Sequence, residues 1–328
     1  MIREILIYEA TGFDPYENLA REKYLMDLCQ PGQCILYLWQ NQNTVVIGRN
    51  QNPWAECRTT LLEDEGGHLA RRLSGGGAVF HDLGNLNFTF LMSEEDQNTD
   101  RQLEVIRQAC LMAGIATEKS GRNDVLAEGR KFSGNAFYHA KGKAYHHGTI
   151  LIHVNGEKLA RYLSPPKAKL AAKGVSSVRS RVVNLQELEP SLTVETMKGY
   201  MKAAFRHVYG LIPQDFVFTE ETENGVTSLA EEYGSWGYLY GTPLACTMEC
   251  EEKFDWGFVQ LQLVARNGIV EGAKIYTDSM DWDLSRQAEE AITGCRFCLG
   301  DLQTALRNKL ANREVAEDFC NLLEKQSI

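Results

Sequence analysis

The densest group of residues capable of chemistry surrounds a glycine run within residues 71–87, which read Arg-Arg-Leu-Ser-Gly-Gly-Gly-Ala-Val-Phe-His-Asp-Leu-Gly-Asn-Leu-Asn. Three consecutive glycines let the backbone turn sharply and let N–H groups approach a ligand with no Cβ in the way. Arg71 and Arg72 add donors that suit phosphate or carboxylate. A glycine run alone is usually a plain loop between strands. The flanking arginines and the His-Asp-x-Gly-Asn that follows favour an anion-binding loop instead.

Two further clusters contain groups that could act on a substrate. Residues 121–124 read Gly-Arg-Asn-Asp, and Lys131 opens a strand-like stretch beside Ser133-Gly134. A lone lysine is usually a solvated surface charge, and Asn-Asp is usually a turn. His146 and His147 lie inside another strand-like run, where packed histidines are commoner than catalytic ones. Residues 111–245 contain no cysteine, so an acyl-cysteine mechanism has no nucleophile there.

Alternating and helical patterns predict the elements that position these groups. Asp14-Pro15 is typical of a helix start, with an N-cap followed by proline. Residues 85–92 alternate apolar and polar types and predict a strand with one core face. The predicted strands cover residues 2–8, 34–39, 44–48, 68–73, 85–92, 131–138 and 143–153. Helices are expected from 14, over 53–64, around 103–110 and over 195–209.

The composition changes near residues 241–243. Beyond this point two predicted strands, 258–265 and 269–276, flank an Asn-Gly turn. Helical patterns follow at 283–292, 301–309 and 313–325. We therefore expect two domains, residues 1–243 and 250–328, the second a small α+β unit. Between the predicted elements, residues 163–185 stand out because they contain five basic residues, two prolines and no acid.

Length, charge and cysteine usage exclude several classes of protein. The chain has 328 residues and a net charge of −10. The negative charge disfavours sequence-independent binding to nucleic-acid phosphates. No apolar run approaches the ~20 residues that span a bilayer, and the N-terminus lacks a signal-peptide pattern. The nine cysteines fit reduced thiols, although Cys246-x3-Cys250 and Cys295-x2-Cys298 leave a zinc site open. We expect a cytoplasmic protein that binds neither nucleic acid nor membrane.

Taken together, these motifs resemble the lipoate–protein ligase A family, which belongs to the biotin and lipoate ligase superfamily. Residues 71–85 closely resemble the lipoate-binding loop of that family. Other stretches are similar to it in the same order, namely 48–54, 121–124, 130–134, 146–149, 169–174, 177–181, 238–243, 255–257 and 276–279. The resemblance implies a mixed α/β sheet with flanking helices as the catalytic domain, followed by a small accessory α+β domain.

The resemblance also implies an activity, with ATP and Mg²⁺ as cofactors and lipoate as substrate. Such ligases form lipoyl-adenylate with release of pyrophosphate, then transfer the lipoyl group to a lysine of a carrier domain. The implied partners are lipoyl domains of 2-oxoacid dehydrogenase E2 subunits and the glycine-cleavage H protein. Lys131 matches the family lysine that contacts both the lipoyl carbonyl and the adenylate phosphate, so it is the predicted catalytic residue. Asp124 is a candidate Mg²⁺ ligand.

By the same resemblance, two sets of residues are predicted to bind the substrates. The expected ATP and adenylate contacts are Arg72, Gly77, Ala78, Val79, Phe80, Asn123, Asp124, Lys131, Lys173 and Gly174. The expected lipoate contacts are Leu19, Trp39, Val46, Ser74, Gly75, Gly76, Gly77, Val79, Lys131 and His147. Apolar members of the second set would look the same in sequence if they were plain core.

The sequence leaves three alternative functions open. An octanoyl or lipoyl transferase of the superfamily would relay the acyl group without ATP, commonly through a cysteine, which the central region lacks. A biotin ligase shares the fold, but the glycine loop here is of the lipoate type. A non-catalytic carrier-binding paralogue would not need Arg72, Lys131 and the full loop.

Overall fold

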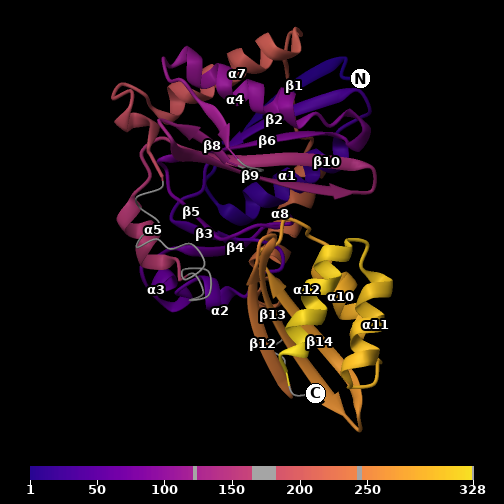
Figure 1. Ribbon diagram of the computed structural model, residues 1–328. Helices are drawn as coiled ribbons and strands as arrows, with labels where there is room; N and C mark the ends of the chain where they lie inside the picture. The colour runs from indigo at the N-terminus through magenta and orange to yellow at the C-terminus, as the bar shows by residue number, and fades with distance from the viewer. Residues whose placement is uncertain (121–123, 165–181, 242–245, 327–328) are drawn as a thin grey trace.

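The computed structural model describes residues 1–120, 124–164, 182–241 and 246–326. Figure 1 shows a large sheet with helices on both faces, and below it a second sheet that carries three helices on one side. The N-terminus lies at the far edge of the large sheet, and the C-terminus lies at the far end of the smaller unit.

The large sheet has eight strands in the order β11-β1-β2-β6-β10-β9-β8-β7. Strand β1 pairs in parallel with β2 and β11, whereas the other pairs are antiparallel, so the sheet is mixed as predicted. The strands are β1 Glu4–Glu9, β2 Gln33–Trp39, β6 Asn85–Ser93, β7 Glu118–Ser120, β8 Asp124–Ala127, β9 Arg130–Ala140, β10 Lys143–Leu151 and β11 Gln214–Asp215.

Helices cover both faces of this sheet (Figure 1). Helices α4 (Thr99–Met112) and α7 (Val194–Tyr209) pack on one face, and α1 (Pro15–Leu28) and α8 (Glu220–Gly234) lie on the other. The prediction that the strand around 85–92 has one core face is wrong, because every residue of β6 is buried. Its polar side chains therefore point into the protein, and two of them reach the functional site.

A three-stranded sheet in the order β4-β3-β5 lies beside the first and holds the glycine run between β4 and β5. Its strands are β3 Thr44–Ile47, β4 His68–Arg71 and β5 Val79–His81. One helix predicted over 53–64 is two, α2 (Pro53–Glu56) and α3 (Thr59–Asp64), because Cys57 is extended and forms a β-bridge with Leu163. Helices α5 (Gly156–Tyr162) and α9 (Trp236–Tyr240) complete this layer, and 3₁₀ turns occur at Glu94–Asp96 and Leu185–Glu187.

The C-terminal domain has its own hydrophobic core. Its antiparallel sheet contains β12 (Met248–Phe254), β13 (Gly257–Arg266) and β14 (Ile269–Thr277). The helices α10 (Leu284–Ile292), α11 (Leu299–Lys309) and α12 (Arg313–Glu324) pack on one face of that sheet (Figure 1). Asn267 and Gly268 both have positive φ, as the predicted Asn-Gly turn requires. The predicted fold class is therefore confirmed. None of the described helices combines the length and apolarity that a membrane crossing would need.

Candidate active site

A cavity of about 410 Å³ opens where the glycine run, the large sheet and the C-terminal domain meet. One face of β2, β6 and β10 forms its floor, and the loop after β14 contributes to its wall. The residues that line it are Leu19, Trp39, Val46, Arg72, Gly76, Gly77, Ala78, Val79, His81, Asn87, Asp124, Lys131, Gly134, Asn135, Ala136, His147, Gly148, Thr149, Asp278 and Met280. The cavity thus joins an apolar section to a section with cationic groups.

Arg72 holds the glycine run in shape. Its guanidinium donates to the Ser74 hydroxyl and to the carbonyls of Gly75, Gly77 and Val46, at 2.8–3.2 Å. Burial lowers the pKa of Arg72 to about 10, which still leaves the group cationic at neutral pH. Arg72 lines the cavity, but most of its N–H donors are engaged with the loop and with the Val46 carbonyl of β3. Arg72 therefore affects a bound ligand mainly by fixing the conformation of the loop.

Gly48, at the end of β3, lets the glycine run approach closely. A Cβ at Gly48 would lie 2.2 Å from the carbonyl oxygen of Gly76. The Arg49 N–H donates to the Ser74 carbonyl at 2.9 Å, which fixes the other side of the loop. Gly76 itself has φ +91°, a conformation that favours glycine. The motif at 48–49 and the glycine run thus form one unit.

The C-terminal domain contacts this unit through the loop after β14. The N–H of Gly76 donates to the Ser279 carbonyl at 3.0 Å, and the Thr277 N–H donates to the Asn50 carbonyl at 2.8 Å. The guanidinium of Arg49 lies over the Trp282 ring at 4.9 Å. Asp278 and Met280 from the same loop line the cavity. The site is therefore built from both parts of the chain.

A chain of hydrogen bonds runs beneath the glycine run. Ser74 Oγ lies 2.8 Å from His147 Nε2, and His147 Nδ1 lies 2.8 Å from Glu22 Oε1. Thr89 donates to the same carboxylate and accepts from the indole N–H of Trp39. The order Ser-His-Glu matches a nucleophile-base-carboxylate series, but Ser74 is fully buried and does not line the cavity. The series therefore positions the loop relative to the sheet and α1.

Lys131 and Asp124 lie together at the edge of the cavity. The Lys131 ammonium is 2.7 Å from Asp124 Oδ1, and both side chains are partly exposed. Lys131 sits at the start of β9, beside a register shift in the β8–β9 pair. The aliphatic end of its side chain passes close to Gly134, where a Cβ would lie 3.1 Å from Cε. An ammonium held this way can reach an anion in the cavity.

The apolar section of the cavity is walled by Leu19, Trp39, Val46 and Val79. The Trp39 ring stacks on Tyr37 at 5.7 Å between centroids, and its indole N–H is bonded to Thr89. These contacts fix the orientation of the indole. The structure thus brings the four predicted apolar residues to one cavity, as a slot for an apolar chain requires.

Other predicted residues lie elsewhere. Ser74 and Gly75 are buried and do not line the cavity. The Phe80 side chain packs on Tyr162, away from the cavity. Asn123, Lys173 and Gly174 lie outside the described residues. The predicted sets do not include several other residues of the cavity or of the hydrogen-bond chain beneath it, among them Glu22, His81, Asn87, Asp278 and Met280. His81 and Asn87 belong to the glycine-run motif, which could have pointed to them.

Two neutral buried histidines should make stability depend on pH. Burial lowers the pKa of His81 and of His146 to about 3, and the nearby Arg72 charge adds to this effect at His81. In the unfolded chain these groups titrate near ~6.5, so below that pH the unfolded state binds more protons and stability falls. From pH 7.5 to 5.5 we expect a loss of about 2–3 kcal/mol for the pair, measured by denaturant unfolding.

Single replacements separate the two contributions to this pH dependence. His146→Phe and His81→Phe should each remove about half of the slope. A free energy of unfolding that stays constant between pH 7.5 and 5.5 would contradict the assignment.

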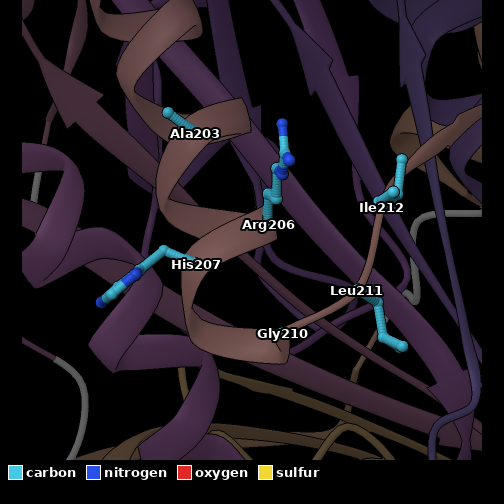
Figure 2. A pocket seen from close by; sticks show the side chains of 6 residues that line it. All are labelled: Ala203, Arg206, His207, Gly210, Leu211 and Ile212. Atoms are coloured by element: carbon cyan, nitrogen blue, oxygen red, sulfur yellow. The ribbon is translucent and has the colours of Figure 1, made fainter.

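A second hollow, of about 400 Å³, lies at the C-terminal end of α7. It is lined by Ala203, Arg206, His207, Gly210, Leu211 and Ile212. Figure 2 shows His207 pointing away from Leu211 and Ile212, on the other side of the helix. No convergent set of polar groups forms here among these six residues, so the cavity at the glycine run remains the candidate active site.

Comparisons with known proteins show which family the chain resembles over its whole length. Residues 14–206 match the model of the lipoyl protein ligase A/B catalytic domain, and residues 244–323 match that of the bacterial lipoate protein ligase C-terminus. Lipoate-protein ligase A of Bdellovibrio bacteriovorus is 36% identical and covers 98% of this chain and 100% of its own length. The enzyme of that name from Blochmanniella pennsylvanica is 40% identical over 82% of both chains.

Solved structures share the fold. P. falciparum LipL1 in complex with lipoate superposes with a TM-score of 0.84 at 24% identity and covers 98% of this chain and 99% of its own. A bipartite lipoate protein ligase from Thermoplasma acidophilum, described with its E2 lipoyl domain, has a TM-score of 0.65 at 25% identity, covering 76% of this chain and 100% of its own. A lipoate-protein ligase A bound with ATP has a TM-score of 0.64 at 24% identity, covering 74% and 99%. The chain belongs to the lipoate–protein ligase A family.

Proposed function

We propose that this protein activates lipoate with ATP to form lipoyl-adenylate, and then transfers the lipoyl group to a lysine of a lipoyl carrier domain. The observation that carries this proposal is the continuity of one cavity, in which an apolar slot ends near a lysine and a glycine-rich loop. An acyl chain fits the apolar slot, while its carboxylate and a nucleotide phosphate fit the cationic end.

In the first step a lipoate carboxylate oxygen attacks the α-phosphorus of ATP. A bond forms between that oxygen and phosphorus, and the bond to the bridging oxygen breaks, so pyrophosphate leaves. Both reactants are anionic, and the Lys131 ammonium offsets their repulsion and the charge of the transition state. Backbone N–H groups of the loop around Gly77 and Ala78 supply further donors. The apolar walls exclude water from the acyl group.

In the second step the amine of the carrier lysine attacks the acyl carbonyl of lipoyl-adenylate. The new C–N bond forms, the bond from the carbonyl carbon to the phosphate oxygen breaks, and AMP leaves with the loss of the amine proton. The proposed carriers are lipoyl domains of 2-oxoacid dehydrogenase E2 subunits and the glycine-cleavage H protein. Support comes from the Thermoplasma acidophilum ligase, which is described with its E2 lipoyl domain.

Mg²⁺ is proposed to accompany ATP. In nucleotide sites this ion is held by one or two carboxylates together with phosphate oxygens. Asp124 and Asp278 both line the cavity and are the carboxylates that would hold the ion there, with Asp124 as the first candidate. When bound, the ion neutralises phosphate charge. Lys131 meanwhile stays paired with Asp124 until an anion competes for its ammonium.

The transferase alternative lacks its usual nucleophile at this site. None of the described residues that line the cavity is a cysteine, and burial raises the pKa of Cys29, Cys34, Cys57 and Cys110 to about 12. Thiols with a raised pKa are poor nucleophiles at neutral pH. An ATP-dependent route fits these residues better than a cysteine relay.

We further propose that the chain divides into a catalytic domain, residues 1–243, and an accessory domain, residues 250–328. The separate C-terminal core supports this division, although β12 already begins at Met248. We propose that the protein acts in the cytoplasm, where ATP is available and where nine free cysteines stay reduced.

The test is incubation of the purified protein with ATP, Mg²⁺, lipoate and a purified apo lipoyl domain. Mass spectrometry should find the lipoyl domain heavier by one lipoyl group, and pyrophosphate release should require lipoate. A carrier whose acceptor lysine is replaced with arginine is the control and should stay unmodified. Transfer without ATP would instead indicate the transferase reaction, and no modification under any condition would indicate a non-catalytic paralogue.

A further inference from the structure

Two buried polar atoms at the apolar section of the cavity have no partner within the described part of the chain. They are Nε2 of His81 and Nδ2 of Asn87. Both residues line the cavity, and their exposed fractions are 4% and 2%. Buried polar atoms in native proteins are almost always hydrogen-bonded, because an unpaired one keeps its full desolvation cost. Two unpaired atoms on one apolar cavity therefore point to a ligand group that pairs with them.

The surroundings of His81 fix which ring nitrogen carries the proton. Asn18 Nδ2 lies 2.9 Å from the Gln40 carbonyl, which can only accept, so the amide nitrogen of Asn18 must face it. The same nitrogen donates to Asn41 Oδ1, which turns Asn41 Nδ2 toward His81 Nδ1 at 3.3 Å. Because His81 Nδ1 accepts, the proton of the neutral ring is on Nε2, so Nε2 is an unpaired donor on a residue that lines the cavity.

The Asn87 amide presents a second donor. Its Oδ1 accepts from Asn85 Nδ2 at 2.8 Å, and its own Nδ2 is the atom without a partner among the described residues. Asn87 is the cross-strand partner of Trp39, and the Trp39 ring lies 6.2 Å from the His81 ring. Lys131 is on β9, two strands away from Asn87, or ~10 Å at the usual strand spacing. Both donors thus lie beside Trp39, and Asn87 is two strands across the sheet from Lys131.

We propose that His81 and Asn87 are specificity-determining residues, whose N–H groups donate to the dithiolane sulfurs of lipoate and favour it over sulfur-free acids of similar shape. The inference rests on the proposed function, and it adds that the apolar section of the cavity recognises the dithiolane ring of lipoate. A divalent sulfur accepts hydrogen bonds weakly, but a hydrocarbon does not accept them at all. A sulfur-free acyl chain would leave both donors buried and unpaired, and such a mismatch is how sites reject analogues.

The decisive probe is 5-cyclopentylpentanoate, in which two CH₂ groups replace the two sulfurs of lipoate. Wild-type protein should bind this acid about tenfold more weakly than lipoate in calorimetry, and kcat/KM for pyrophosphate release should fall similarly. His81→Phe and Asn87→Leu remove the donors while filling the space. Each should lower the preference for lipoate to within about threefold, mainly by weakening lipoate.

His146→Phe is the matched control. His146 is also a fully buried neutral histidine, but its two nitrogens are bonded to Gln102 and Asn135, and it does not line the cavity. If it folds less well, both acids should lose turnover together and their ratio should stay as in wild type. That ratio separates substrate recognition from structural damage in all three variants.

Equal affinity of wild-type protein for the two acids would overturn the inference, and this measurement needs no variant to fold. Retention of the wild-type preference in both donor variants would also overturn it. The proposed function is judged separately, by lipoate-dependent pyrophosphate release in wild-type protein. Binding by calorimetry decides the role of His81 and Asn87 even where that release is absent.

Discussion

Lys131→Ala is expected to slow lipoyl-adenylate formation by about 10²–10³-fold, because it removes a cation that binds the transition state better than the separated reactants. The Lys131 ammonium is a partly exposed positive group at the cavity, whereas the Arg72 guanidinium is bonded to the loop. Lipoate-dependent release of pyrophosphate, followed in single-turnover experiments, measures the effect directly.

The stability of the Lys131→Ala protein should change little. The side chain is 38% exposed, and an ion pair of this kind contributes at most about 1 kcal/mol. Lys119→Ala is a matched control, since Lys119 also forms an exposed ion pair, with Asp100 at 3.0 Å, but does not line the cavity. Near wild-type adenylation by Lys131→Ala would show that the loop donors alone suffice and that Lys131 is not catalytic.

Features with local causes could be predicted from the sequence. Asp14 does cap the first helix, where its carboxylate accepts from the N–H groups of Tyr16 and Glu17. The turn at Asn267-Gly268 has positive φ at both residues, which Asn and Gly tolerate. Each of these depends on a few neighbouring residues, so the short-range pattern carries the information.

Features set by distant contacts could not be predicted. The break at Cys57 depends on pairing with Leu163, more than a hundred residues later. Strand β6 alternates apolar and polar residues because Asn87 and Thr89 face a cavity and a hydrogen-bond chain, not because that face is solvated. An alternating pattern indicates two different faces, but it does not say what covers the polar one.

The site also combines features with local causes and features set by distant contacts. The position of the site could be predicted, because three consecutive glycines are visible in the sequence itself. The sequence analysis predicted that Arg72 contacts the ATP phosphates. In the structure its N–H groups donate to Ser74 and Gly77, a direction that depends on how the loop folds back on itself. Glu22 is hydrogen-bonded to His147, which is 125 residues away in the sequence, and Asp278 of the C-terminal domain lines the cavity. No local sequence spacing predicts either contact.

Gly75→Ala is expected to lower lipoyl-adenylate formation by ~10²-fold through the contact between the two domains. A Cβ at Gly75 would lie 2.2 Å from the Ser279 carbonyl oxygen and 3.0 Å from backbone atoms of Met280. Backbone cannot rotate away as a flexible side chain can, so the glycine run and the C-terminal loop must separate by an ångström or more. The Gly76–Ser279 hydrogen bond would break, and Asp278 and Met280 would leave the cavity wall.

Gly300→Ala, in α11 of the C-terminal domain, separates this effect from general damage to that domain. Among the described residues, leaving out its chain neighbours and the backbone of its own helix, no atom lies within 4 Å of a Cβ at Gly300, which does not line the cavity, so this variant should stay near wild-type activity. Because the C-terminal core is separate, Gly75→Ala should keep the secondary structure of both domains while limited proteolysis cleaves between them more readily. If Gly75→Ala formed adenylate at the wild-type rate, the domain contact would be incidental to the chemistry, and the catalytic domain alone would have to organise the glycine run.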